Sequence, residues 1–259
     1  MAITPDESYN LRLYWSNRAE TPDQCATRFT RMLEGMREID GAFRQWKRSV
    51  RTREEVENPP ADFSPDIPSD AKGLQAMFQG SGQYYDFPPD KPWPELGYWL
   101  SMWNEMDDPF RMILTVNAGA YGARITRPNS VNLQLSRRRI DTGRAWHGGE
   151  LRDLVSLFVE AWSADEASVN CFRYFPFLIC TDNGKCLLPC GGWLTYLPPQ
   201  RLARITPPKD VDVETLANGG AILTLCEEPF TIDNPRHLEL AASLNEALRP
   251  IQALPEILS

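Results

Sequence analysis

The sequence contains few of the residues, and none of the motifs, on which most catalytic sites depend. Only two histidines, His147 and His237, occur among 259 residues, and neither lies in a recognisable motif. The G-x-S-x-G elbow that presents a nucleophilic serine is absent. The phosphate-binding patterns G-x-G-x-x-G and G-x4-G-K-[ST] are also absent, so the glycine pairs at 191–192 and 219–220 are interpreted as turns. We therefore predict no catalytic residue and no cofactor.

The spacing of the six cysteines also departs from that of a metal site. They lie at positions 25, 171, 180, 186, 190 and 226, and the tightest spacings are C-x5-C and C-x3-C. Structural zinc sites are usually built from C-x2-C pairs, because two thiolates of one tight turn then reach the same ion. Cys180 also ends a strongly apolar run. We predict no metal site, and free thiols in a reducing compartment.

The sequence lacks long apolar runs and an excess of positive charge. No stretch approaches the roughly 18 apolar residues that span a bilayer, and the first residues have neither the basic start nor the apolar segment of a secretory signal. These features predict a cytoplasmic protein without a membrane partner. The net charge of −8 argues against direct nucleic-acid binding, which needs surplus Lys and Arg, and it favours a basic protein partner.

The N-terminal segment predicts a strand followed by a long helix. Large apolar residues occupy positions 9, 11, 13 and 15, the period of a strand with one buried face. Thr21 and Gln24 form a capping box around Pro22, which starts a helix. Apolar residues then recur at intervals of three and four from Cys25 to Trp46, so the helix is predicted over 22–47, with a bend near Gly41.

Later patterns indicate further strands and two more core helices. Residues 98–104 and 112–118 are predicted to pair antiparallel across a turn, and 131–135 to form a third strand. Strands are also predicted at 172–181, 191–197 and 221–226, and helices at 151–162 and from 234 to about 250. The predicted fold class is α+β, a largely antiparallel sheet with long amphipathic helices packed on one face. We expect one domain over 1–259, with an internal duplication of halves at about 9–120 and 130–250.

The opening segment resembles a known family. The run from Leu13 to Arg18, followed by 20–21, 25–28, 32–33, 39–40, Phe43 and Trp46, is similar to the start of the immunity protein 52 family. A weaker similarity extends to 225–229. The family accompanies polymorphic toxins of bacteria and is typically paired with toxins of the restriction-endonuclease fold. The resemblance implies an immunity protein, not an enzyme, that binds a cognate toxin, here a nuclease effector of a type VI secretion system.

Acidic and aromatic residues in proline-rich loops and turns are the predicted contact sites for such a partner. We select six, because acidic rims attract basic proteins and aromatic side chains contribute strongly to interfaces. They are Asp86, Asp90, Trp93, Glu95, Asp107 and Asp108. Inhibition could follow from occlusion of a nuclease cleft or from a block of toxin assembly, and the sequence does not separate the two. Two other functions stay open, a carboxylate-dependent hydrolase and a scaffold or chaperone for a secreted effector. The arginine cluster at 124–144 is interpreted as surface or internal ion pairs.

Overall fold

The structure is a computed structural model that describes residues 7–49, 66–83, 91–122, 129–177 and 189–252. In these residues nine strands form one sheet in the order β2-β3-β4-β5-β1-β6-β7-β9-β8, and every neighbouring pair is antiparallel. The strands are β1 (Tyr9–Trp15), β2 (Lys47–Arg48), β3 (Tyr98–Trp103), β4 (Ile113–Ala118), β5 (Asn129–Gln134), β6 (Glu166–Cys171), β7 (Leu194–Leu197), β8 (Asp212–Thr215) and β9 (Ala221–Thr224). The prediction of an α+β protein with a largely antiparallel sheet is confirmed.

The first strand lies in the middle of this sheet. β1 pairs with β5 on one side, where Leu13 faces Val131, and with β6 on the other, where Leu11 faces Val169. Its odd-numbered residues are buried, as their spacing predicted, because they face the helical layer. Tyr9 also donates a hydrogen bond from its hydroxyl to the carbonyl of Phe230, which ties β1 to the C-terminal part of the chain.

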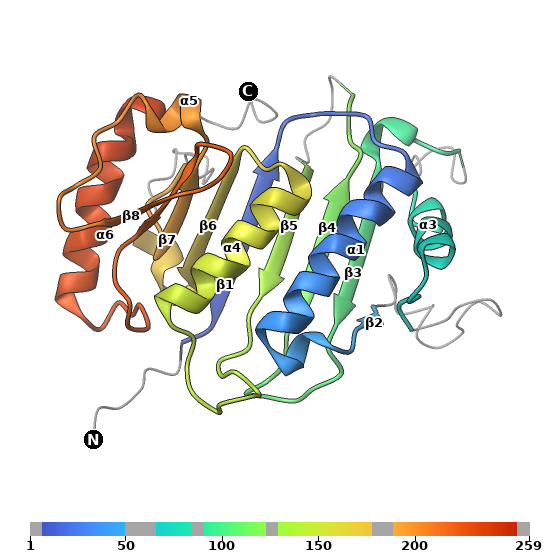
Figure 1. The fold of residues 1–259 in the computed structure, drawn as a ribbon, viewed down its shortest axis with the longest axis horizontal. Helices are drawn as coiled ribbons and strands as arrows, with labels where there is room; N and C mark the ends of the chain where they lie inside the picture. The colour runs from blue at the N-terminus through green and yellow to red at the C-terminus, as the bar shows by residue number, and fades with distance from the viewer. Residues whose placement is uncertain (1–6, 50–65, 84–90, 123–128, 178–188, 253–259) are drawn as a thin grey trace.

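Three helices cover one face of the sheet (Figure 1). They are α1 (Pro22–Ile39), α3 (Ala71–Gly80) and α4 (Gly148–Trp162), and α1 packs against both of the others. Trp162 of α4 stacks on Trp15 of β1 with ring centroids 5.0 Å apart, and Phe78 of α3 meets Phe29 of α1 edge to face at 5.6 Å. Such aromatic pairs add to the gain from burial. The predicted packing of long helices on one face is thereby confirmed.

The predicted start of α1 is confirmed, but its predicted end is wrong. Thr21 and Gln24 form the capping box, and Pro22 occupies the first turn. The helix ends at Ile39 and not at 47, because Asp40 takes an extended conformation and its carboxylate accepts the N–H of Ala42, which starts the 3-10 helix Gly41–Phe43. Phe43 and Trp46 remain in the core without belonging to α1.

Arg139 stabilises the conformation of the chain at the point where α1 ends. Its Nε lies 3.0 Å from the carboxylate of Asp40, its Nη2 donates to the Ile39 carbonyl at 2.5 Å, and its Nη1 pairs with Glu150 of α4. The Asp40 side chain is completely buried, so the guanidinium supplies its counter-charge. Arg144 pairs with Glu150 as well, at 2.9 Å, so both of these arginines from the basic cluster form ion pairs within the fold.

The C-terminal third differs most from the predicted elements. The strand predicted at 172–181 is wrong for its first six residues, because Phe172–Phe177 is a 3-10 helix, and 178–181 lie outside the described residues. A strand, β6, lies directly upstream of this 3-10 helix instead. The strand β8 was not predicted. The helix α6 (Pro235–Leu248) matches the last predicted helix and lies at the β7–β9–β8 end of the sheet, close to the short α5 (Pro199–Leu202) (Figure 1).

Candidate functional site

The two faces of the sheet are covered to different extents along its width. In β6, β7 and β9 every residue is buried, so both faces are covered there. In β4 and β5 buried residues alternate with half-buried ones, and β3 follows this alternation from Trp99 onwards. The buried set faces α1, α3 and α4. The other set faces away from these helices and forms a partly exposed surface.

We call this surface the open face. Because paired residues of neighbouring strands point to the same side, the register defines its members. They are Lys47 on β2, Trp99, Ser101 and Trp103 on β3, Ile113, Thr115 and Asn117 on β4, Ser130, Asn132 and Gln134 on β5, and Asn10, Arg12 and Tyr14 on β1, of which Asn10 is buried. Most carry hydroxyl or amide groups, and two tryptophans lie at the β3 edge. Alternation of this kind was visible in the sequence, but it was used only to identify the buried residues.

Some polar atoms of the open face have no partner in the described part of the chain. Asn117 donates from Nδ2 to the Ser130 hydroxyl at 3.4 Å, but its Oδ1 accepts no hydrogen bond. Asn132 Oδ1 likewise accepts no hydrogen bond, and Arg12 Nε donates none. The three atoms are shielded by neighbouring side chains, and the Arg12 guanidinium lies 4.5 Å from the centroid of the Phe175 ring. Buried polar groups without partners are unfavourable, so these three atoms lower the stability of the sheet.

Two of the six predicted partner residues, Trp93 and Glu95, lie just before β3. The Trp93 indole donates to the Glu95 carboxylate at 3.4 Å, and the Glu95 carbonyl accepts the N–H of Tyr121. Tyr121 is itself 44% exposed, one of the most exposed large apolar side chains among the described residues. An aromatic and acidic group therefore forms at this end of β3, and the sequence did not indicate the contribution of Tyr121.

Asp107 and Asp108 lie at the opposite end of β3, in the connection to β4. Asp107 is almost fully exposed and pairs with Arg111 at 3.3 Å, while Asp108 is exposed. Six strand residues span about 20 Å, so these two acids are well separated from Trp93 and Glu95. The structure thus places the four in two groups and not in one patch. Asp86 and Asp90 lie outside the described residues.

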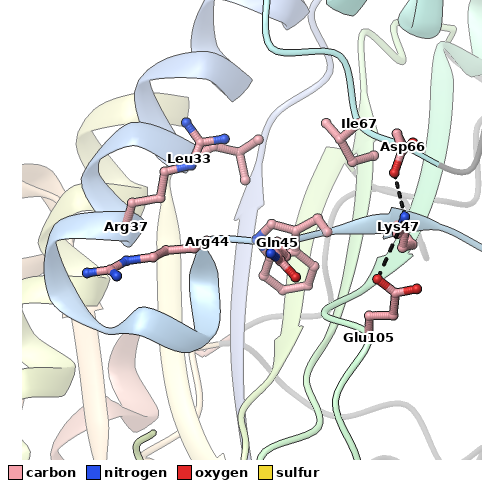
Figure 2. A pocket seen from close by; sticks show the side chains of 9 residues that line it. Leu33, Arg37, Arg44, Gln45, Lys47, Asp66, Ile67 and Glu105 are labelled. Atoms are coloured by element: carbon pink, nitrogen blue, oxygen red, sulfur yellow. Dashed lines mark hydrogen bonds and ion pairs between the residues drawn. The ribbon is translucent and has the colours of Figure 1, made fainter. Parts of the chain in front are cut away.

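A pocket of about 370 Å³ opens where α1 ends and β2 begins (Figure 2). On one side Lys47 lies between two carboxylates, 2.5 Å from Asp66 and 3.7 Å from Glu105. On the other side lie Arg37 and Arg44, which are exposed and form no ion pair with any described residue. Figure 2 shows their side chains extending in different directions. A single anion would need them to converge, so the pocket offers a mixed-charge surface and not one anion site.

Cys226, Glu228 and His237 bring three metal-ligand atoms within 4.8 Å of one another. However, His237 Nδ1 accepts the N–H of Thr231 at 3.1 Å, so the neutral ring carries its proton on Nε2, 3.0 Å from Glu228. A metal would need Nε2 unprotonated. The geometry therefore describes a hydrogen-bonded histidine, and this bond lowers the pKa of Glu228.

The described thiols and the second histidine have structural positions. Cys25, Cys171 and Cys190 are buried and Cys226 is half-buried, all as free thiols, while Cys180 and Cys186 lie outside the described residues. Burial raises the pKa of Cys25, Cys171 and Cys226 to about 12, which suppresses the reactive thiolate. His147 is the N-cap of α4, and its N–H is accepted by Glu150 at 3.0 Å.

The described residues form a sheet protein with a broad, partly exposed face. The model of the immunity protein 52 family matches residues 7–254, nearly the whole chain. The chain therefore belongs to the immunity protein 52 family. Among solved structures, the Pseudomonas aeruginosa T6SS protein PA0821 is similar, with a TM-score of 0.54 and 11% identity over 95% of this chain and 73% of that chain. At this identity the similarity is one of fold. No curated protein matches the sequence.

No helix in the described segments combines the length and the apolar character that a membrane span requires.

Proposed function

We propose that this protein neutralises a cognate toxin by direct stoichiometric binding, without turnover of its own. The observation that carries the proposal is the match to the immunity protein 52 family over residues 7–254. A binding function also agrees with the form of the molecule. Binding to another protein requires area, and the open face and the neighbouring connections provide such an area.

We propose that the toxin is a nuclease effector of a type VI secretion system and that it has the restriction-endonuclease fold. The two proteins would bind each other in the cytoplasm. The type VI assignment is supported by the fold shared with PA0821, which is described as a T6SS protein. The nuclease assignment is supported by charge. A nuclease carries a basic surface for the phosphate backbone, and the net charge of −8 on this chain is complementary to it. Inhibition would follow either from occlusion of the nuclease cleft or from a block of toxin assembly.

Co-expression with the toxin encoded beside this gene tests the proposal. We expect cells that carry both proteins to survive, and the two to co-purify at a fixed ratio. An unrelated nuclease toxin, expressed at the same level, should kill cells despite the presence of this chain. Undiminished killing by the neighbouring toxin, with no complex recovered, would overturn the proposal. Cells that survive because the toxin has been removed, with no stable complex recovered, would instead favour an enzymatic function.

A further inference from the structure

The strand β8 ends the sheet on the side of α6, and only one of its two edges is paired within the described part of the chain (Figure 1). Its inner edge pairs antiparallel with β9. All four residues of β8 are exposed. An exposed strand edge offers backbone N–H and C=O groups to which another extended chain can add a further strand.

The hydrogen-bond pattern identifies which backbone groups of β8 point outwards. Directly after β8, the N–H of Leu216 donates to the Gly220 carbonyl at 2.8 Å. Hydrogen-bonded pairs alternate along an antiparallel ladder, so Glu214 bonds to β9, whereas Val213 and Thr215 do not. The N–H and C=O groups of Val213 and Thr215 therefore point away from β9. No other described backbone group bonds to them.

The side chains of β8 give the two sides of this edge different chemistry. Asp212 and Glu214 lie on the side of α4, where both pair with Arg152, at 3.4 and 3.2 Å. Glu227 pairs with the same guanidinium. Val213 points to the opposite side, because neighbouring residues of a strand alternate. Val213 is 43% exposed, so an apolar side chain of a partner could pack against it.

The α4 side of the edge stays negative after these ion pairs are counted. Arg152 is the only cation within ion-pair distance of Asp212, Glu214 and Glu227 in the described segments. Three carboxylates against one guanidinium leave a net charge of −2. Each of the three carboxylate side chains is more than half exposed and can reach a partner. This charge favours a basic chain at the edge.

The same charge argues against a second copy of this protein as the occupant. Two β8 strands paired antiparallel would bring Asp212 and Glu214 of both copies together on one side of the sheet, and like charges across a strand pair are destabilising. Upstream of β8 the charges cancel, because Lys209 and Arg236 are balanced by two acids, Asp210 and Glu239. An extended basic segment of another protein is therefore the occupant that fits this edge.

We propose that the outer edge of β8 binds an extended basic segment of the cognate toxin, which adds a strand to the sheet. The backbone of the segment bonds to Val213 and Thr215. A Lys or Arg of the segment lies beside Glu214, and an apolar residue packs against Val213. This inference rests on the proposed immunity function and names the kind of toxin segment that β8 takes. It assigns no contact to the open face.

Amide hydrogen exchange, resolved by residue with NMR spectroscopy, tests the added strand in the wild-type protein. In the free protein the N–H groups of Val213 and Thr215 should exchange quickly, whereas that of Glu214, which bonds to β9, should exchange more slowly. In the complex with the toxin encoded beside this gene, we expect exchange at Val213 and Thr215 to slow by about 10-fold or more. Unchanged exchange at both residues in a saturated complex would overturn the inference.

Val213→Pro tests the backbone pairing separately, because it removes one outward N–H and leaves the ladder to β9 in place. The matched control is Val213→Ile, which keeps both the N–H and an apolar side chain. Binding to the toxin would be measured by calorimetry, and the thermal midpoint would verify folding. We expect the proline variant to bind about 10-fold more weakly or worse, and the isoleucine variant to stay within about 3-fold of the wild type. Equal affinity of the proline variant and the wild type would refute the pairing.

Glu214→Lys tests the charge of the segment. We expect it to weaken binding by about 10-fold, with a smaller loss in about 1 M salt, which screens exposed charges. Glu34→Lys, the same change at an exposed position of α1, should bind like the wild type. Wild-type affinity of Glu214→Lys would refute a basic partner. Self-association of the free protein that Val213→Pro abolishes would identify a second copy as the occupant and overturn the inference.

Failure of this inference can be distinguished from failure of the proposed function. A toxin complex in which neither hydrogen exchange nor the β8 variants show the expected change refutes the β8 edge alone. If the wild-type protein forms no complex with the toxin, the proposed function fails and the inference fails with it.

Discussion

Substitution of Arg139 by alanine should destabilise the protein strongly. The change removes the counter-charge of Asp40, whose carboxylate is fully buried and, among the described residues, retains only the N–H groups of Ala42 at 2.8 Å and Ile140 at 3.3 Å. Glu150 loses less, because Arg144 still pairs with it. A buried ion pair broken on one side typically costs about 3 to 5 kcal/mol. For a chain of this size that corresponds to a fall in thermal midpoint of roughly 6 to 20 °C.

The assay is thermal and urea unfolding followed by circular dichroism. Arg249→Ala is the matched control, since Arg249 and its partner Glu246 are each more than half exposed and such pairs contribute at most about 1 kcal/mol. Adding Asp40→Asn to Arg139→Ala should recover part of the loss, because a neutral amide needs no counter-charge. If Arg139→Ala unfolds at the same midpoint as Arg249→Ala, or if Asp40→Asn adds a further full loss, the reasoning about the buried charge is wrong.

Three further predictions concern a buried carboxyl group, the histidine near Glu228 and the buried thiols. Burial raises the pKa of Glu166 to about 7, above its value in the unfolded chain. The contribution of Glu166 to stability should therefore fall as pH rises from about 4.5 to 7, by about 1.4 kcal/mol per unit of pKa difference. Glu166→Gln should flatten that part of the stability profile, and an unchanged slope would contradict the raised pKa of Glu166. Zinc should leave the thermal midpoint unchanged, because the Nε2 of His237 carries its proton; a saturable stabilisation that His237→Ala abolishes would show that the ring can rearrange. Cys25 and Cys171 should react with an aromatic disulfide reagent at pH 8 only after unfolding, because burial raises the pKa of both to about 12; mass spectrometry of the native protein would detect labelling that contradicts this.

The elements that could be predicted from the sequence are those in which the spacing of the apolar residues matches the spacing of the buried positions. β1, β3, β4 and β5 have one buried and one partly exposed face, so alternation identified them. The capping box at Thr21 identified the start of α1. β6 was missed because it is buried on both faces and includes Ser168 and Asn170, which removes the alternation. β8 was missed because all four of its residues are exposed.

The candidate site was less predictable than the fold. Acidic and aromatic residues of loops can be selected from a sequence, but their separation cannot, and Trp93 and Asp107 lie at opposite ends of one strand. The open face depends on which side of the sheet the helices cover, a property of long-range packing that no local pattern carries. The end of α1 at Ile39 likewise depends on Arg139, which lies 100 residues further along the chain. The single domain over 1–259 and the duplication of its halves stay predictions.

The central position of β1 has a consequence for the order in which the protein can fold. Its partners on either side are residues 129–134 and 166–171, so the first strand to be synthesised cannot be paired until more than half of the chain has left the ribosome. Pairings this distant in sequence are slow to form, because much of the chain must be ordered before they are made. Until Gln134 is available, β1 presents two unpaired edges and an apolar face, and its edge toward β6 stays unpaired until Cys171 is available. Newly made chains thus depend on synthesis of residues 129–171 for protection of β1 against association, so the supply of active protein lags behind translation.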